Sequence, residues 1–146
     1  MNRVRMTRGA AAGAVAAAVW ALQQPADQRV FGVPYDDTEL LGKFVTRGPA
    51  WRPAGWAIHL ANGAAFGAAY AHLAPRMPGP AWARGPLAAM VENVVSWPGV
   101  ALSERLHPAR EELPALWRVP GAFAQATWRH LLFGAVLGEL ERRLND

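Results

Sequence analysis

The sequence contains no cysteine and only one lysine, Lys43, among its 146 residues. The absence of thiols excludes disulfides, thiolate metal sites and cysteine nucleophiles. The net charge is +4, but the arginines are scattered and form neither a basic run nor a basic helix face, so we expect no nucleic-acid partner. The motifs of hydrolases, kinases, phosphate-binding loops and metalloproteases are also missing. An enzyme is therefore not the favoured interpretation, and we expect no metal.

Charge is nearly absent from four stretches of the chain. Each stretch has 18 to 23 residues and carries one charge or none, with Glu92 in the third and Arg129 in the fourth. A membrane-spanning helix needs roughly 20 predominantly apolar residues. We therefore predict an all-α, four-transmembrane-helix bundle that forms a single domain over residues 1–146. The predicted helices cover residues 9–26, 53–75, 85–103 and 119–140.

A soluble helical domain is the alternative, and the pattern argues against it. Soluble surface helices show a charged face that recurs every three to four residues, and these stretches show none. A chain of this size cannot bury four helices that are apolar on all sides. Several of the seven tryptophans lie near the ends of the stretches, as in an interfacial aromatic belt. We expect a multi-pass membrane protein, surrounded by the lipid bilayer.

The N-terminal segment allows two interpretations. Arg3, Arg5 and Arg8 precede an alanine-rich core, which also fits a cleaved secretory signal peptide that would leave three helices. We prefer a retained first helix that closes at Pro25. The short connectors and both tails are basic, whereas the longer connectors balance their bases with acids. Both termini are therefore expected on the cytoplasmic side.

The two longer connectors, residues 27–52 and 104–118, are not featureless. Asp37 is a candidate cap for a short helix that runs through Leu40 to Val45. The second connector has apolar residues from Leu106 to Trp117. Both connectors are expected to rest on the bilayer surface or to close over the bundle.

The spacing His-x-x-x-Gly-x-x-x-Gly occurs twice, 71 residues apart. Residues four apart share a helix face, and glycine lets another backbone approach closely. The repeat predicts two tandem helical hairpins related by an axis along the membrane normal. The first stretch adds a further glycine pair. The predicted helix-packing residues are Gly9, Gly13, Gly63, Gly67, Gly134 and Gly138.

Glu92 and Arg129 both lie close to the middle of their stretches. Charges at this depth are costly and usually face the bundle interior in pairs. We predict a Glu92–Arg129 ion pair that sets helix register. The alternatives are a site for a substrate, a proton or a lipid headgroup, and a charge that extends to the interface. The surrounding polar cluster is completed by Asn62, Asn93, Ser96, His59 and His130.

His59 and His130 occupy equivalent positions of the repeat. Two histidines from two helices can hold a b-type haem from both sides. Against this, a close-packing glycine face follows each histidine, and His59 lies farther from its helix centre than His130. We therefore expect interhelical hydrogen bonds and no cofactor, with haem b as the alternative. His72 and His107 lie outside the predicted bundle core.

Several short segments resemble small multi-helix inner-membrane proteins of the actinobacterial type and, more distantly, the YagU-like proteins. The resemblance covers about the last two thirds of the chain. It implies membrane helices in the bacterial inner membrane and carries over no activity. The segments are 59–63, 66–70, 92–98 and 129–139.

These observations predict a structural or accessory membrane component that acts through helix packing and association with itself or a larger membrane protein. The rival is a small transporter or cofactor-binding protein built on the Glu92, Arg129 and histidine cluster. A closed, dry ion pair would favour the first hypothesis. A polar cavity open to one side would favour the second.

Overall fold

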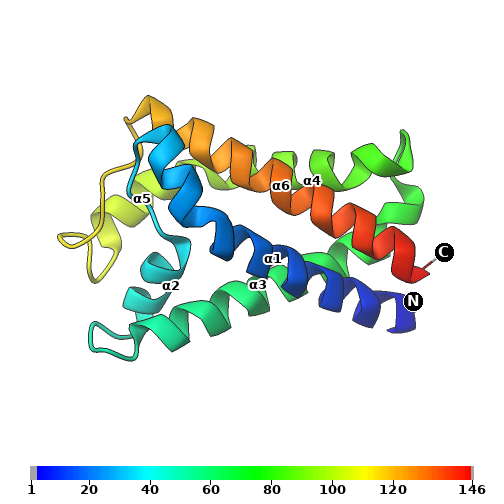
Figure 1. The fold of residues 1–146 in the computed structure, drawn as a ribbon, viewed down its shortest axis with the longest axis horizontal. Coiled ribbons are helices and arrows are strands. Elements are labelled where there is room, and N and C mark those ends of the chain that lie inside the picture. The colour runs from blue at the N-terminus through cyan, green and yellow to red at the C-terminus, as the bar shows by residue number, and fades with distance from the viewer. Residues whose placement is uncertain (1–2, 146) are drawn as a thin grey trace.

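The computed structural model describes residues 3–145, and this part of the chain is helical without any strand. Both ends of the chain lie at one end of the molecule, and α2 and α5 lie at the other (Figure 1). The elements are α1 (Arg3–Phe31), α2 (Asp37–Val45), α3 (Trp51–Leu73), the 3-10 turn η1 (Ala74–Arg76), α4 (Ala81–Ser96), α5 (Pro98–Leu106) and α6 (Pro120–Asn145).

The four charge-poor stretches are largely helical, but α1, α4 and α6 extend beyond their predicted bounds and the third predicted helix is divided. α1 does not close at Pro25 and continues to Phe31. Proline removes one hydrogen-bond donor, and the turn that follows is held in place by side-chain bonds from Asp27 and Gln28 to other parts of the fold. The third stretch is divided at Trp97, because Pro98 begins a new helix.

The short helix predicted after the first long one is present as α2, but its cap is Asp36 and not Asp37. The Asp36 carboxylate accepts hydrogen bonds from the N–H groups of Thr38 and Glu39. These bonds satisfy two of the free donors at the start of the helix. Asp37, the first helical residue, is thereby left to bind elsewhere.

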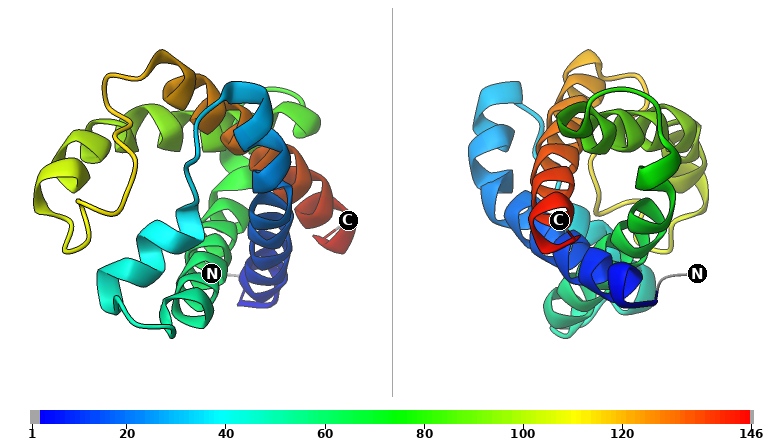
Figure 2. Two further views of the ribbon diagram at one scale, coloured as in Figure 1. Left: turned by 60° about the vertical axis from the view of Figure 1, so that its left-hand side comes forward. Right: turned by 90° about the vertical axis from the view of Figure 1, so that its right-hand side faces the viewer.

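The long helices form two antiparallel pairs. α1 packs against α3, α4 packs against α6, and α1 and α6 join the two pairs. Within residues 3–145, α3 and α4 do not pack along one another. The views in Figures 1 and 2 agree on this arrangement.

Glycines make both helix pairs possible. A Cβ atom on Gly13 of α1 would lie 2.0 Å from the carbonyl oxygen of Gly63 in α3. In the second pair, a Cβ atom on Gly85 of α4 would lie 2.2 Å from the carbonyl oxygen of Gly134 in α6. The two copies of the repeat thus occupy matching places, because each contacts the first helix of its own pair. Gly9, Gly67 and Gly138 complete these contacts.

The interior contains small and polar residues, and many large apolar side chains lie outside. Alanines such as Ala16 are fully buried, as are Arg129 and Gln125. Phe133 and Leu137 are among the few large apolar residues of the core. Exposed apolar side chains cover α4 in particular: Trp82, Leu87, Val91, Val94 and Val95. Across the described residues, none of the helices has both the length and the apolar character that crossing a membrane would require.

Candidate functional site

A cavity of about 650 Å³ lies where α3 and α4 diverge. It is partly open to the outside and is lined by residues from all the α-helices. Its volume falls within the range of small-molecule sites. The lining is mainly apolar, with a few polar groups that include His59 and Asn62 from α3, Glu92, Asn93 and Ser96 from α4, and Arg129 and His130 from α6.

The end of the cavity near α2 is closed by the connector that follows α5. His107 Nε2 lies 3.0 Å from the carbonyl oxygen of Leu40 in α2. Glu112 accepts ion pairs from Lys43 at 2.9 Å and from Arg47 at 3.0 Å. The hydrogen bond from Lys43 lowers the pKa of Glu112 below its usual value. Of the two arrangements considered for the outer connectors, these contacts correspond to closure over the bundle at this end.

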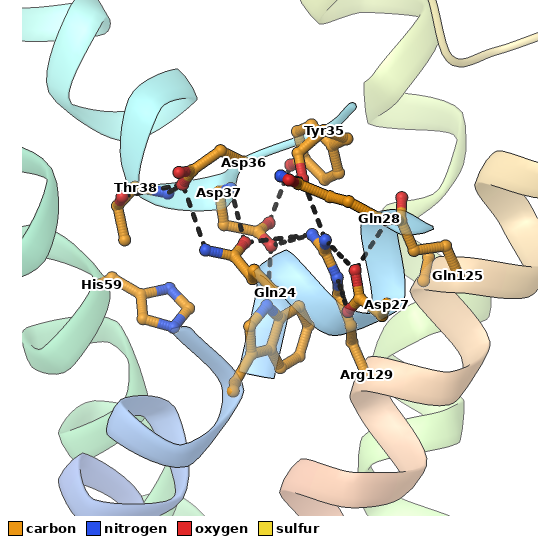
Figure 3. Close-up of polar contacts among 12 residues, drawn as sticks. Gln24, Asp27, Gln28, Tyr35, Asp36, Asp37, Thr38, His59, Gln125 and Arg129 are labelled. Atoms are coloured by element: carbon orange, nitrogen blue, oxygen red, sulfur yellow. Dashed lines mark hydrogen bonds and ion pairs between the residues drawn. The ribbon is translucent and has the colours of Figure 1, made fainter. Parts of the chain in front are cut away.

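Arg129 does not pair with Glu92, which corrects the predicted ion pair. Its guanidinium binds both carboxylate oxygens of Asp27 at 2.6 Å and one oxygen of Asp37 at 2.7 Å. Gln24 Oε1 and the carbonyl oxygen of Tyr35 accept its remaining N–H groups (Figure 3). All five donors of the guanidinium are thus used. The Arg129 side chain is 0% exposed and Asp27 is 1% exposed.

Residues around Asp37 complete this network. Trp20 Nε1 donates to Asp37 Oδ2 at 2.7 Å, and the Tyr35 hydroxyl donates to Asp37 Oδ1 at 2.8 Å. Burial raises the pKa of Tyr35 well above its ordinary value, and the charge of Asp37 raises it further. The phenol therefore remains protonated and available as a donor. The result is a closed polar network that ties α1 and α2 to α6.

Glu92 instead pairs with His130, the neighbour of Arg129 in sequence. Glu92 Oε2 lies 2.6 Å from His130 Nε2, and His130 Nδ1 lies 2.7 Å from the carbonyl oxygen of Ala126. The Glu92 side chain is 42% exposed, whereas that of His130 is 12% exposed. This pair lines the cavity, so Glu92 is the carboxylate that an occupant can reach.

The two partners of His130 fix the number of protons in the pair. The Ala126 carbonyl can only accept, so Nδ1 must donate to it. One further proton is then needed between Nε2 and Glu92 Oε2, and it lies either on the ring or on the carboxyl group. In both cases the Glu92–His130 pair has no net charge.

The other imidazoles of the cavity are satisfied as neutral rings. His107 Nδ1 accepts from the N–H of Ala109, so its Nε2 donates to Leu40. His59 Nε2 lies 3.0 Å from the carbonyl oxygen of Ala17 and needs a single ring proton there. His130 is therefore the one histidine lining the described cavity whose partners demand a second proton.

The two repeat-related histidines both line the cavity, and each ring already has a partner. Trp20 contacts both rings edge-on, with centroid distances of 5.7 Å to His59 and 4.7 Å to His130. Each Nε2 atom already has a hydrogen-bond partner. A haem held between them would require both rings to break these bonds. Among the described residues, no group of three or more histidine, aspartate or glutamate side chains is placed to hold a metal ion.

The remaining predicted cluster residues lie along α3 and α4. Asn93 donates to Thr127 Oγ1 of α6 at 3.3 Å, so it links the second helix pair. Ser96 donates to the Asn93 carbonyl oxygen at 3.4 Å. Asn62 is exposed on the α3 wall of the cavity.

Sequence reasoning missed the acidic partners of Arg129. Asp27 follows Pro25, so the sequence pattern predicts that it lies in a connector, and the same pattern makes Asp37 a candidate helix cap. A usable signal was the polar run that surrounds Pro25, namely Gln23, Gln24, Asp27 and Gln28. Such a run on a continuing helix supplies acceptors for a buried cation.

Comparison of the chain with known family models, with curated proteins and with solved structures found no match.

Proposed function

We propose that this protein is an integral membrane protein that binds a small molecule in the cavity between its two helix pairs. The observation that carries this proposal is the cavity itself, which combines a mainly apolar wall with a reachable carboxylate at Glu92. Small-molecule sites have this composition, in which apolar surface supplies affinity and a few polar groups supply orientation. A small transporter or a ligand-binding accessory protein would use such a site.

The distribution of apolar surface supports the membrane part of the proposal. Large exposed apolar patches on a soluble monomer mark an interaction surface or a membrane surface. Here Leu87, Val91 and Val94 lie on α4 away from the cavity, while Arg129 and Gln125 are buried. In a bilayer, polar side chains belong in the bundle interior, and small residues mediate helix contacts.

The arrangement of basic residues supports an orientation. Both chain ends lie at the same end of the molecule (Figure 1). Arg3, Arg5 and Arg8 begin the first helix, and Arg142 and Arg143 end the last. By the positive-inside rule, we infer that this end faces the cytoplasm of the inner membrane.

The Arg129 network favours a second role, which is structural. The Arg129 guanidinium has no free donor, and its partners differ from the predicted Glu92. We assign it to assembly of the two helix pairs and assign ligand binding to the cavity beside it. The structural or accessory function predicted from sequence thus remains as the alternative for the whole protein.

Replacement of Asn62 by tryptophan tests the cavity. The new indole would occupy cavity space, because Asn62 is exposed on its wall. Native mass spectrometry of the wild-type protein, released gently from detergent, is expected to show a stoichiometric small-molecule adduct. N62W is expected to lose it.

Leu87→Trp is the matched control, because Leu87 is 54% exposed and does not line the cavity. It should retain the adduct. A wild-type protein free of any adduct, or an adduct that survives in N62W, would contradict the proposal. An absorption spectrum of the same sample reports whether the adduct is a haem.

A further inference from the structure

The charged residues that line the cavity indicate what kind of ligand it binds. Among the described residues that line it, three are carboxylates and two are guanidiniums, and the extra proton of the Glu92–His130 pair brings the net charge of the lining to zero. They are Asp37, Glu92, Glu104, Arg110 and Arg129. The sign of the charge that the cavity can bind therefore depends on which of these groups lacks a partner.

The partners of these five charged residues show that Glu92 is the one left to bind a charged ligand. Arg129 has no donor left for an anion, and Asp37 is bound to it. Glu104 accepts the N–H groups of Leu116 and Trp117. Arg110 lies toward the outside with its side chain 51% exposed and faces Glu111. The half-exposed carboxylate of Glu92 is therefore the charged group available inside.

The remainder of the wall suits an apolar body. Phe66 and Phe133 pack edge-to-face at 5.5 Å between ring centroids, and both line the cavity with Trp20. Leu41 and Val100 add aliphatic surface. Burial of apolar atoms contributes roughly 25 cal/mol for each Å² removed from water. Such a wall selects a ligand whose body is mostly hydrocarbon.

Because the Glu92–His130 pair is uncharged, binding of a cation to Glu92 would add a positive charge to the cavity. A cation that binds Glu92 meets a pair already balanced by the proton between His130 Nε2 and the carboxylate. Adding a second positive charge in an apolar surrounding is costly. The exchange of one positive charge for another avoids this cost.

We propose that the cavity takes a lipophilic primary ammonium, which displaces the proton shared by Glu92 and His130. This inference rests on the proposed function. The ammonium donates to the Glu92 carboxylate and to Nε2 of His130, and the displaced proton leaves to water. His130 stays neutral and keeps its Nδ1–H bond to Ala126. No electrons move, and one cation replaces one proton.

The separation of α3 from α4 is consistent with such a ligand. The two helices that flank the cavity do not pack along one another. A hydrocarbon body can therefore enter between these two helices without separating either helix pair. The ammonium then reaches Glu92 on the inner side of α4.

The test uses quenching of tryptophan fluorescence in the full-length protein in detergent. The probes are para-bromophenylbutylamine, the corresponding alcohol and the corresponding carboxylate. Bromine quenches nearby indoles, and Trp20 and Trp97 line the cavity. The amine is expected to quench saturably and to bind about tenfold or more tightly than the alcohol, because a hydrogen bond to a charged group is stronger than one between neutral groups. The carboxylate is expected not to saturate.

Glu92→Gln is the decisive variant, since it keeps the shape of the side chain and removes the charge. It is expected to weaken amine binding by about tenfold or more. Glu139→Gln is the matched control, because the Glu139 side chain is also 42% exposed and lies outside the cavity. This control should bind as the wild type does.

A measurement of proton release distinguishes exchange of the shared proton for the ammonium from electrostatic attraction of the ammonium alone. In weakly buffered solution with a pH-indicator dye, the wild-type protein should release close to one proton for each amine bound, and E92Q should release none. Affinity should rise with pH, because binding releases a proton. Amine binding without proton release would overturn the exchange.

Other outcomes distinguish this inference from the proposed function. Equal binding of amine and alcohol, or an amine affinity unchanged in E92Q, would overturn the ammonium inference while the cavity function stands. If Asn62→Trp alters the binding of none of the three probes, the cavity is not the site and both proposals fail.

Discussion

Arg129→Ala is expected to lower the free energy of unfolding by about 3–5 kcal/mol, the usual cost of breaking a buried ion pair. The substitution leaves the Asp27 carboxylate buried at 1% exposure without its main partner. It also leaves Asp37 with only its neutral donors. The measurement is reversible unfolding in mixed micelles with increasing denaturing detergent.

Arg143→Ala is the control for loss of an arginine. Its side chain is 69% exposed, and it pairs with Glu139 at the surface. Exposed pairs of this kind contribute about 0–1 kcal/mol. A loss in R129A no larger than that in R143A would contradict a stabilising role for the network.

A double-mutant cycle identifies the partner of Arg129. Arg129→Ala combined with Asp27→Ala should cost less than the sum of the single changes, because the orphaned charge is then removed. Arg129→Ala combined with Glu92→Ala should be additive within about 0.5 kcal/mol. The reverse result would restore the pairing predicted from sequence.

Gly13→Ala is expected to lower the free energy of unfolding by about 3 kcal/mol, at the upper end of the cost of overpacking. The added Cβ would lie 2.0 Å from the carbonyl oxygen of Gly63 and 2.9 Å from the Cα of Gly67. Both neighbours are backbone atoms, so the clash cannot be relieved by a side-chain rotation. α1 and α3 would have to separate along the contact.

Gly99→Ala is the matched control for this substitution. Gly99 lies in α5, and no atom lies within 4 Å of the Cβ that would be added. Alanine is more stable than glycine in a helix by roughly 0.5–1 kcal/mol, so G99A should show no loss. Similar losses for G13A and G99A would mean that the α1–α3 contact is not as close as described.

The four long helices could be predicted because stretches that almost lack charged residues form helices whose surfaces can contact apolar surroundings. The glycine spacing likewise placed Gly63 and Gly134 on faces that other helices approach. These patterns are local, so one sequence suffices to see them. The continuation of α1 past Pro25 was not visible, because it depends on contacts with residues about 100 positions away.

The candidate site was harder to predict than the helices. Depth along the helix was a useful guide, because Glu92 does find its partner on α6. It finds His130, however, and not Arg129. Successive residues of a helix point about 100° apart, so Arg129 faces α1 while His130 faces α4. A charge count cannot choose between two neighbours that point to different helices.

The two helix pairs are joined along one line, the contact between α1 and α6. An ion pair lies at each end of this contact. Asp27 pairs with Arg129 at one end, and Arg5 pairs with Glu141 at the other. In the described part of the chain, α3 and α4 do not pack along one another, but the connector after α5 also joins the two pairs where His107 and Glu112 bind α2. We expect a change in the volume of the cavity to rotate one helix pair against the other about the α1–α6 contact and to shift the contacts between the connector and α2. Such a rotation leaves the glycine contacts within each helix pair intact.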